Sequence, residues 1–216
     1  MTNNQDQSAA ISLRERKAAR TRLGLMDAML RRLRKQTFEE ISVKELCADV
    51  DVSEPTFFNH FSSKHDLLVL YVRLWSVEMK QAMGMPKTTA YESLARLFSL
   101  TAQATERLPR LMQEIVSYQM RFPVPAKSAT PTKAELMLRF PSLASAPASI
   151  RSLIETAIDI AVANRELPET TERDAVVSVL AALFFGVPAL HGGSRLAEKT
   201  YLSGLRLIWR GLGGRA

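Results

Sequence analysis

Three helix-start signals lie within residues 42–66, and this spacing leaves room only for short helices joined by tight turns. Ser42, with Glu45 three residues later, has the form of a capping box, which marks a helix N-terminus. Ser53 can cap a second helix in the same way, and Ser63 can cap a third. The sequence therefore predicts two short helices in quick succession, followed by a longer one.

The first two of these helices, expected at 42–49 and 53–61, form a helix-turn-helix, whose second helix typically lies in the major groove of DNA. The turn falls at Asp51, a residue type that tolerates a left-handed conformation. The apolar residues expected to form a core beneath the motif are Val43, Leu46, Cys47, Val50, Val52, Phe57 and Phe61. The side chains expected to face outward, toward bases and phosphates, are Glu54, Thr56, Phe58, Asn59 and His60.

Positive charge is concentrated just before this motif. Residues 12–35 contain nine basic and two acidic residues, a surplus of seven, which equals the net charge of the whole 216-residue chain. Such a segment favours a polyanion, either nucleic acid or an anionic membrane surface. We interpret its first half as a basic arm that binds DNA phosphates, with Arg14 and Lys17 among the contacts. A membrane-surface helix fits less well, because the charges spread around the helix and large aromatic residues are missing.

The stretch from Ser42 to Leu68, with its Val-Ser turn and the run Thr-Phe-Phe-Asn-His-Phe, resembles the DNA-binding region of TetR-family regulators. The resemblance extends back to Arg14 and implies an all-α fold. It implies DNA contacts, mostly to the backbone, from Ser42, Lys44, Thr56, Phe58, His60 and Lys64. The sequence departs from the family pattern at Asp51, Pro55 and Phe58, where glycine, a small residue and tyrosine are usual. Glu54 can accept a hydrogen bond from a cytosine amine, or its negative charge can interact favourably with the dipole at the helix N-terminus.

The rest of the chain also has helical spacing, so we expect an all-α protein of about nine helices. Further helices are expected at 90–106, 109–121, 134–140, 149–164, 171–190 and 194–211. The expected divisions are a disordered tail at 1–11, a helix-turn-helix domain at 12–83, and a helical dimerisation and ligand-binding domain at 86–216.

The last two expected helices are rich in apolar residues and favour a four-helix dimer interface. The interface residues predicted from them are Val176, Val179, Leu180, Leu183, Phe184, Val187, Leu202, Leu205, Ile208 and Trp209. The uncharged run 175–190 is shorter than the roughly 20 residues of a membrane span, and Gly186 and Pro188 interrupt it. We therefore interpret it as a buried helix and expect no membrane partner.

Nine methionines and nine phenylalanines suit an adaptable apolar cavity for a small-molecule effector. The candidate lining residues are Phe98, Met112, Tyr118, Met120, Phe122, Phe140 and Phe185. Each of these is individually more typical of plain core.

Nothing in the sequence indicates an enzyme, and we expect no catalytic, cofactor-binding or metal-binding residues. His60, His65 and Asp66 lack the helix spacing of metal ligands. Cys47 is the single cysteine, which excludes an internal disulfide and favours the reducing cytoplasm.

The hypothesis from the sequence is a homodimeric regulator, more readily a repressor, that binds a palindromic operator in double-stranded DNA. A small apolar or amphipathic ligand of unknown identity would release it. The alternative is a helical small-molecule-binding protein that has lost operator recognition, for which Pro55 and Phe58 are the supporting features.

Overall fold

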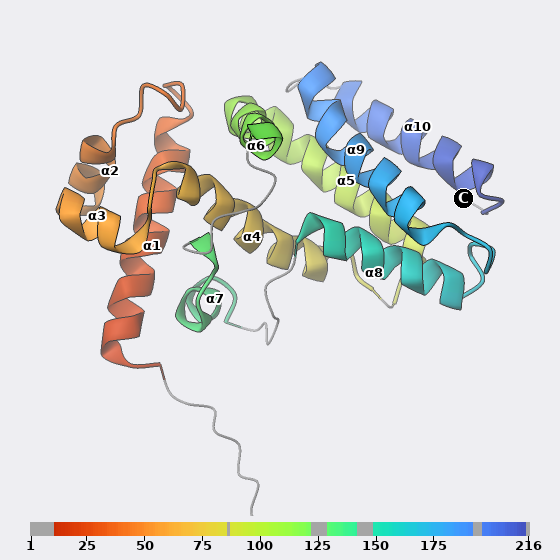
Figure 1. Ribbon diagram of the computed structural model, residues 1–216, viewed down its shortest axis with the longest axis horizontal. Coiled ribbons are helices and arrows are strands. Elements are labelled where there is room, and N and C mark those ends of the chain that lie inside the picture. The colour runs from red at the N-terminus through yellow and green to blue at the C-terminus, as the bar shows by residue number, and fades with distance from the viewer. Residues whose placement is uncertain (1–10, 86, 122–128, 142–148, 192–195, 215–216) are drawn as a thin grey trace, which may run out of the picture.

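A computed structural model describes residues 11–85, 87–121, 129–141, 149–191 and 196–214. All regular elements in these ranges are helices, and they number ten, one more than expected (Figure 1). Their bounds are α1 Leu13–Arg32, α2 Val43–Val50, α3 Glu54–His60, α4 His65–Ala82, α5 Ala90–Arg107, α6 Pro109–Arg121, α7 Lys133–Arg139, α8 Ile150–Ala163, α9 Arg173–His191 and α10 Leu196–Gly211. The all-α prediction is confirmed.

The helix starts at α2 and α3 form as the sequence predicts. The backbone N–H of Glu45 donates to Oγ of Ser42 at 3.2 Å, and the backbone N–H of Ser42 donates to the Glu45 carboxylate at 2.9 Å. This reciprocal pair satisfies two backbone donors that the first helical turn leaves without partners. The Ser53 hydroxyl accepts from the backbone N–H of Thr56 at 3.3 Å and so caps α3.

The third predicted cap is wrong. Helix α4 begins at His65, its N-cap position is occupied by Lys64, and no side chain caps it. Instead, the buried Asp66 carboxylate accepts the backbone N–H of Ser62 at 2.8 Å, and the Ser63 hydroxyl donates to that carboxylate at 3.4 Å. The turn before α4 is therefore held by an acid inside the helix.

The basic segment is not a separate arm, because it belongs to the 20-residue helix α1. Ser12 and Glu15 form a capping box at its start, and the helix continues to Arg32. The cations of residues 14–32 are thus held at fixed helical positions beside the helix-turn-helix, which lies against the same helix in Figure 1.

Helix α9 runs through the predicted interruption and includes both Gly186 and Pro188. Proline cannot donate to the carbonyl four residues earlier, which here belongs to Phe184. The Tyr201 hydroxyl of α10 donates to that carbonyl at 2.6 Å, so the acceptor stays satisfied and the helix continues. Among the described residues, α9 is also the one helix that is long and apolar enough to cross a membrane, and a third of its most apolar window is buried within this single chain.

The apolar side chains form two cores. One lies between α1 and α4 and also takes Leu111, Met112 and Ile115 from α6. The other lies among α5, α8, α9 and α10. Helix α4 runs from the helix-turn-helix toward the second core and contributes to both (Figure 1). Packing therefore crosses the predicted boundary at 83–86, and α4 and α6 connect the two halves.

Candidate nucleic-acid interface and effector cavity

Helices α2 and α3 are set at a fixed angle by a turn in which Asp51 has φ 56°, the left-handed conformation that the sequence predicted. Leu46, Cys47, Phe57 and Phe61 are buried beneath the motif. The three valines predicted for the same core, Val43, Val50 and Val52, are half-buried against it. Because the apolar side of the motif is used in packing, the opposite side is free to contact a partner.

The outer face of α3 presents the residues predicted for base and phosphate contacts. Glu54 and Asn59 are exposed, and the Phe58 side chain is 55% exposed although it is fully apolar. Thr56 and His60 are half-buried at the two ends of the helix. Burial, followed by the nearby Arg22 cation, lowers the pKa of His60. The His60 imidazole is therefore neutral near pH 7 in the absence of a phosphate.

The cations of α1 differ in their partners. Those exposed near its start are Arg14, Arg16, Lys17 and Arg20. By contrast, Arg32 at the other end is occupied, since it donates to both carboxylate oxygens of Asp49 at 2.7 and 2.9 Å and to Glu45 at 2.8 Å. The first group is available to phosphates, whereas Arg32 ties α1 to α2.

Ser42, the N-cap residue of α2, and Lys44 in its first turn are exposed, but the N–H and the hydroxyl of Ser42 both donate to Glu45 at 2.9 Å. Lys64 has a different environment. Its ammonium donates to three carbonyls, those of Phe38 at 2.7 Å, Ile41 at 3.0 Å and Glu39 at 3.1 Å. An ammonium has three hydrogens, so a phosphate contact by Lys64 would require one of these bonds to break.

Arg22 is the cation of α1 that turns inward. Its Nε donates to Oε1 of Glu135 in α7 at 2.7 Å, and its terminal nitrogens donate to the carbonyls of His60 at 2.9 Å and Thr130 at 3.4 Å. The guanidinium also lies over the ring of Phe61, 4.5 Å from its centroid. Arg22 thus connects α7 to the last residue of α3.

A cavity of about 510 Å³ lies among α4, α6, α8 and α9. Its lining residues are Leu68, Val69, Val72, Arg73, Ser76, Ile115, Tyr118, Gln119, Ser149, Ile150, Arg151, Ser152 and Phe185. This volume falls within the usual range for small-molecule sites, which are mostly apolar with a few polar groups.

Two of the seven residues predicted to line a pocket, Tyr118 and Phe185, lie in this cavity. Phe98 and Met112 are buried in the two cores instead. Met120 is exposed, and Phe140 packs against the N-terminal core. Phe122 lies outside the described residues. The aromatic and methionine content therefore mostly reflects core packing.

The predicted dimer residues divide by exposure. Six are buried within the single chain, so their side chains cannot form a surface: Val176, Leu180, Phe184, Val187, Leu205 and Trp209. Val179 is 50% exposed, and Leu183, Leu202 and Ile208 are half-buried. The exposed strip of α9 is instead made by Val179 with small residues at positions 175 and 182, and it continues to the half-buried position 186.

Sequence reasoning missed the two arginines of the cavity, Arg73 and Arg151. A signal for Arg73 was present, because it is the single charged residue in the mostly apolar stretch between Asp66 and Glu78. Arg151 follows the predicted cap Ser149, and nothing in the local pattern distinguishes it from a solvated surface residue.

The helix-turn-helix has a known counterpart. Residues 25–70 match the sequence profile described as bacterial regulatory proteins, tetR family. The chain carries a TetR-family domain. This match covers the last eight residues of α1, all of α2 and α3, and the start of α4. No curated protein matches the sequence.

Solved structures extend the likeness from these residues to the fold of the whole chain. The Thermus thermophilus FadR, a TetR-family transcriptional repressor crystallised with lauroyl-CoA, shares 20% identity at a TM-score of 0.66, covering 90% of this chain and 96% of its own. Salmonella enterica GusR shares 19% identity at a TM-score of 0.60, and the match covers 89% of this chain and 94% of that one. A TetR transcriptional regulator from Rhodococcus sp. RHA1 shares 16% identity at a TM-score of 0.57, and the match covers 90% of this chain and 97% of that one. These relatives share the arrangement of an N-terminal helix-turn-helix followed by a helical domain.

Proposed function

We propose that this chain is a transcriptional repressor that binds a palindromic operator as a homodimer and is released by a small amphipathic ligand. The observation that carries the proposal is the exposed outer face of α3 beside the cationic start of α1. Glu54 and Asn59 can reach base edges, while Arg14 and Lys17 can bind phosphates.

The surface of α9 and α10 supports a homodimer. The Val179 side chain is half-exposed, and Leu207 on α10 is 73% exposed. Next to Val179 lies a shallow groove lined by Ala175, Ile208 and Leu212 among others. A second copy of these two helices would cover the apolar strip and form a four-helix interface. It would also present two α3 helices to successive major grooves, which is the geometry that reads a palindrome.

Release by a ligand requires a site outside the DNA interface, and the cavity among α4, α6, α8 and α9 meets that condition. Helix α4 connects this cavity to the helix-turn-helix, so occupation of the cavity can shift the spacing of two recognition helices. Repression is favoured over activation, because a bound dimer blocks polymerase without further contacts. The proposal places the protein in the cytoplasm and gives it no catalytic role.

The experiment is a fluorescence anisotropy titration of the purified protein with a pool of random duplexes of about 30 base pairs, roughly three helical turns. Non-specific binding should be present at about 50 mM salt and should weaken steeply by about 200 mM, because bound phosphates release their counterions. Absence of binding at the lower salt concentration would favour the alternative, a ligand-binding protein without operator recognition.

A further inference from the structure

The cavity has an apolar part and a cationic part. Leu68, Val69 and Val72 of α4, Ile115 of α6 and Phe185 of α9 provide the apolar walls. Two arginines and several neutral polar groups complete the lining, and none of its described residues is an aspartate or glutamate. The described lining thus contains two cationic side chains and no acidic one, and the charge that it presents to a ligand depends on the partners of these two arginines.

The charge of Arg73 is not neutralised by any acid in the part of the chain that the structure describes. Its guanidinium donates to the hydroxyl of Thr130, a neutral acceptor, and no ion pair joins it to an acid among the described residues. A guanidinium carries five donors in a planar fork that matches a carboxylate, sulfonate or phosphate. Arg73 is therefore equipped to exchange a single hydroxyl for an anionic partner.

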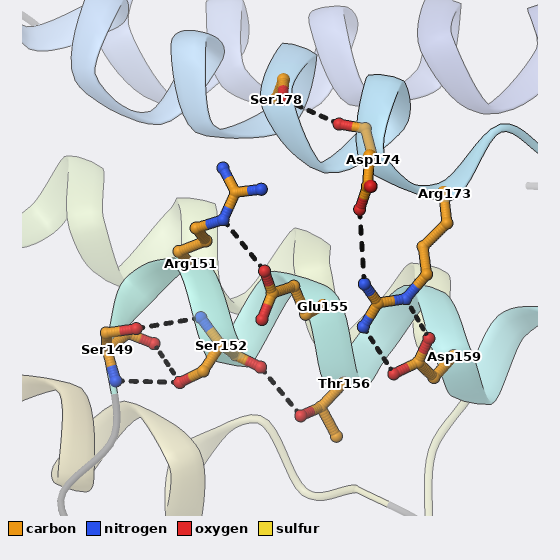
Figure 2. Close-up of polar contacts among 9 residues, drawn as sticks. All are labelled: Ser149, Arg151, Ser152, Glu155, Thr156, Asp159, Arg173, Asp174 and Ser178. Carbon is orange, nitrogen blue, oxygen red and sulfur yellow. Dashed lines mark hydrogen bonds and ion pairs between the residues drawn. The ribbon is translucent and has the colours of Figure 1, made fainter.

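Arg151 lies in the first turn of α8, and its charge is less available to a ligand than that of Arg73. Its Nε donates to Glu155 at 2.9 Å, and Figure 2 shows no contact from its two terminal nitrogens to the residues drawn. Ser149 and Ser152 cap each other's backbone at the same helix end. Because Glu155 already neutralises Arg151, Arg73 is the residue on which the charge preference of the cavity depends.

We propose that the cavity binds a small amphipathic anion, whose apolar body packs against α4, α6 and α9 and whose acidic group binds Arg73 in place of the Thr130 hydroxyl. This inference rests on the proposed ligand-controlled function and narrows it to one class of effector. The bond from Arg73 to the Thr130 hydroxyl has one charged partner, whereas an acid supplies a second charge and can accept two parallel N–H bonds from the guanidinium, which favours the exchange.

Hydrogen bonds connect the Arg73–Thr130 pair to helix α3. The carbonyl of Thr130 accepts from Arg22 at 3.4 Å, and Arg22 in turn donates to the carbonyl of His60 at 2.9 Å. Thr130 is thus bonded through its hydroxyl to the cavity and through its carbonyl to the cation that supports the end of α3. An anion that takes Arg73 away from Thr130 removes one restraint on this connection and so provides a route from effector to DNA affinity.

The test uses two dyes that share an apolar body and differ in charge. The anion is 8-anilinonaphthalene-1-sulfonate, and its neutral counterpart is N-phenyl-1-naphthylamine. Fluorescence titrations of the full chain, without DNA, are expected to give saturable binding of the sulfonate. Arg73→Gln should weaken the sulfonate about tenfold and leave the neutral dye unchanged. Arg96→Gln, which removes an exposed arginine of α5, serves as the matched control and should change neither.

A second variant tests the exchange with Arg73 intact. Thr130→Val removes the competing hydroxyl at nearly constant shape and should tighten sulfonate binding several-fold. Equal sulfonate affinity in wild type and Arg73→Gln, or an equal loss of both dyes, would overturn the anionic site. An unchanged affinity in Thr130→Val would overturn the competition. Since no DNA is present, these failures are distinguishable from a failure to bind an operator.

Discussion

Arg22 in α1 and Glu135 in α7 form an ion pair at 2.7 Å, although 113 residues separate them in the sequence. Their side chains are 8% and 0% exposed. Glu135 also accepts the backbone N–H of Thr132 at 2.6 Å and so caps its own helix. A single carboxylate therefore starts α7 and fixes it to the helix that supports the helix-turn-helix.

Glu135→Gln should destabilise the protein strongly. Glutamine can keep the capping box, since it fits the same pattern, but it leaves Arg22 buried without its counter-charge. Removing one partner of a buried pair costs about 3–5 kcal/mol, and the carbonyl acceptors of Arg22 place the expected loss near the lower end. Urea unfolding would measure it. Combining Glu135→Gln with Arg22→Met is the control, because it keeps the capping box and leaves no unpaired buried charge, and it should restore most of the stability. A larger loss in this double variant would contradict the expectation.

Lys64→Gln separates two roles for this residue. The resemblance to TetR-family regulators implies a phosphate contact, whereas the structure directs the ammonium to three carbonyls. We expect a loss of about 2 kcal/mol in unfolding free energy, typical of hydrogen bonds to a charged group, and an unchanged salt dependence of DNA binding. A slope of log K against log salt that becomes about 0.9 less negative would show that Lys64 binds a phosphate instead.

Two arginines of α1 should differ in their effect on DNA binding. Arg14 is exposed near the start of the helix, whereas Arg32 is occupied by Asp49 and Glu45. Arg14→Gln should make the slope of log K against log salt about 0.9 less negative and leave the free energy of unfolding unchanged. Arg32→Gln, the matched control, should leave the slope unchanged and reduce stability modestly, as for other partly exposed ion pairs. Identical slopes for the two variants would argue against α1 as a phosphate-binding surface.

Val179→Asp should dissociate the proposed dimer, because it places a charge in the centre of the apolar strip of α9. Analytical ultracentrifugation over a concentration series is expected to show a dimer for wild type and a monomer for the variant. Met137→Asp on α7 is the control, since Met137 is 49% exposed and Val179 is 50% exposed. A dimer that persists in Val179→Asp would place the interface elsewhere.

Local signals in the sequence predicted most of the helices. Capping residues such as Ser42 and Ser53 act within three positions along the chain, so their pattern is visible without a structure. Long-range contacts had no such pattern. The pair of Arg22 with Glu135, and the Tyr201 hydroxyl that lets α9 continue through Pro188, join positions far apart in sequence.

The sequence predicted the candidate DNA-binding face but not the lining of the cavity. The recognition helix lies on one short capped segment, and its exposed face follows from helical periodicity. The cavity is assembled from four helices, so aromatic and methionine content alone mostly selected core residues. Ser63 was misassigned because Asp66, buried inside α4, satisfies the turn that Ser63 was expected to cap.

The most direct test of the account is selection of operator sequences by the wild-type protein from a random duplex library, followed by sequencing. The account predicts enrichment of an inverted repeat whose half-sites lie about 10 base pairs apart or a multiple of that. Asn59→Ala should then alter the preferred bases without abolishing binding. Enrichment of no inverted repeat, with the protein folded and binding duplexes at low salt, would contradict the claim that this chain is an operator-binding dimer.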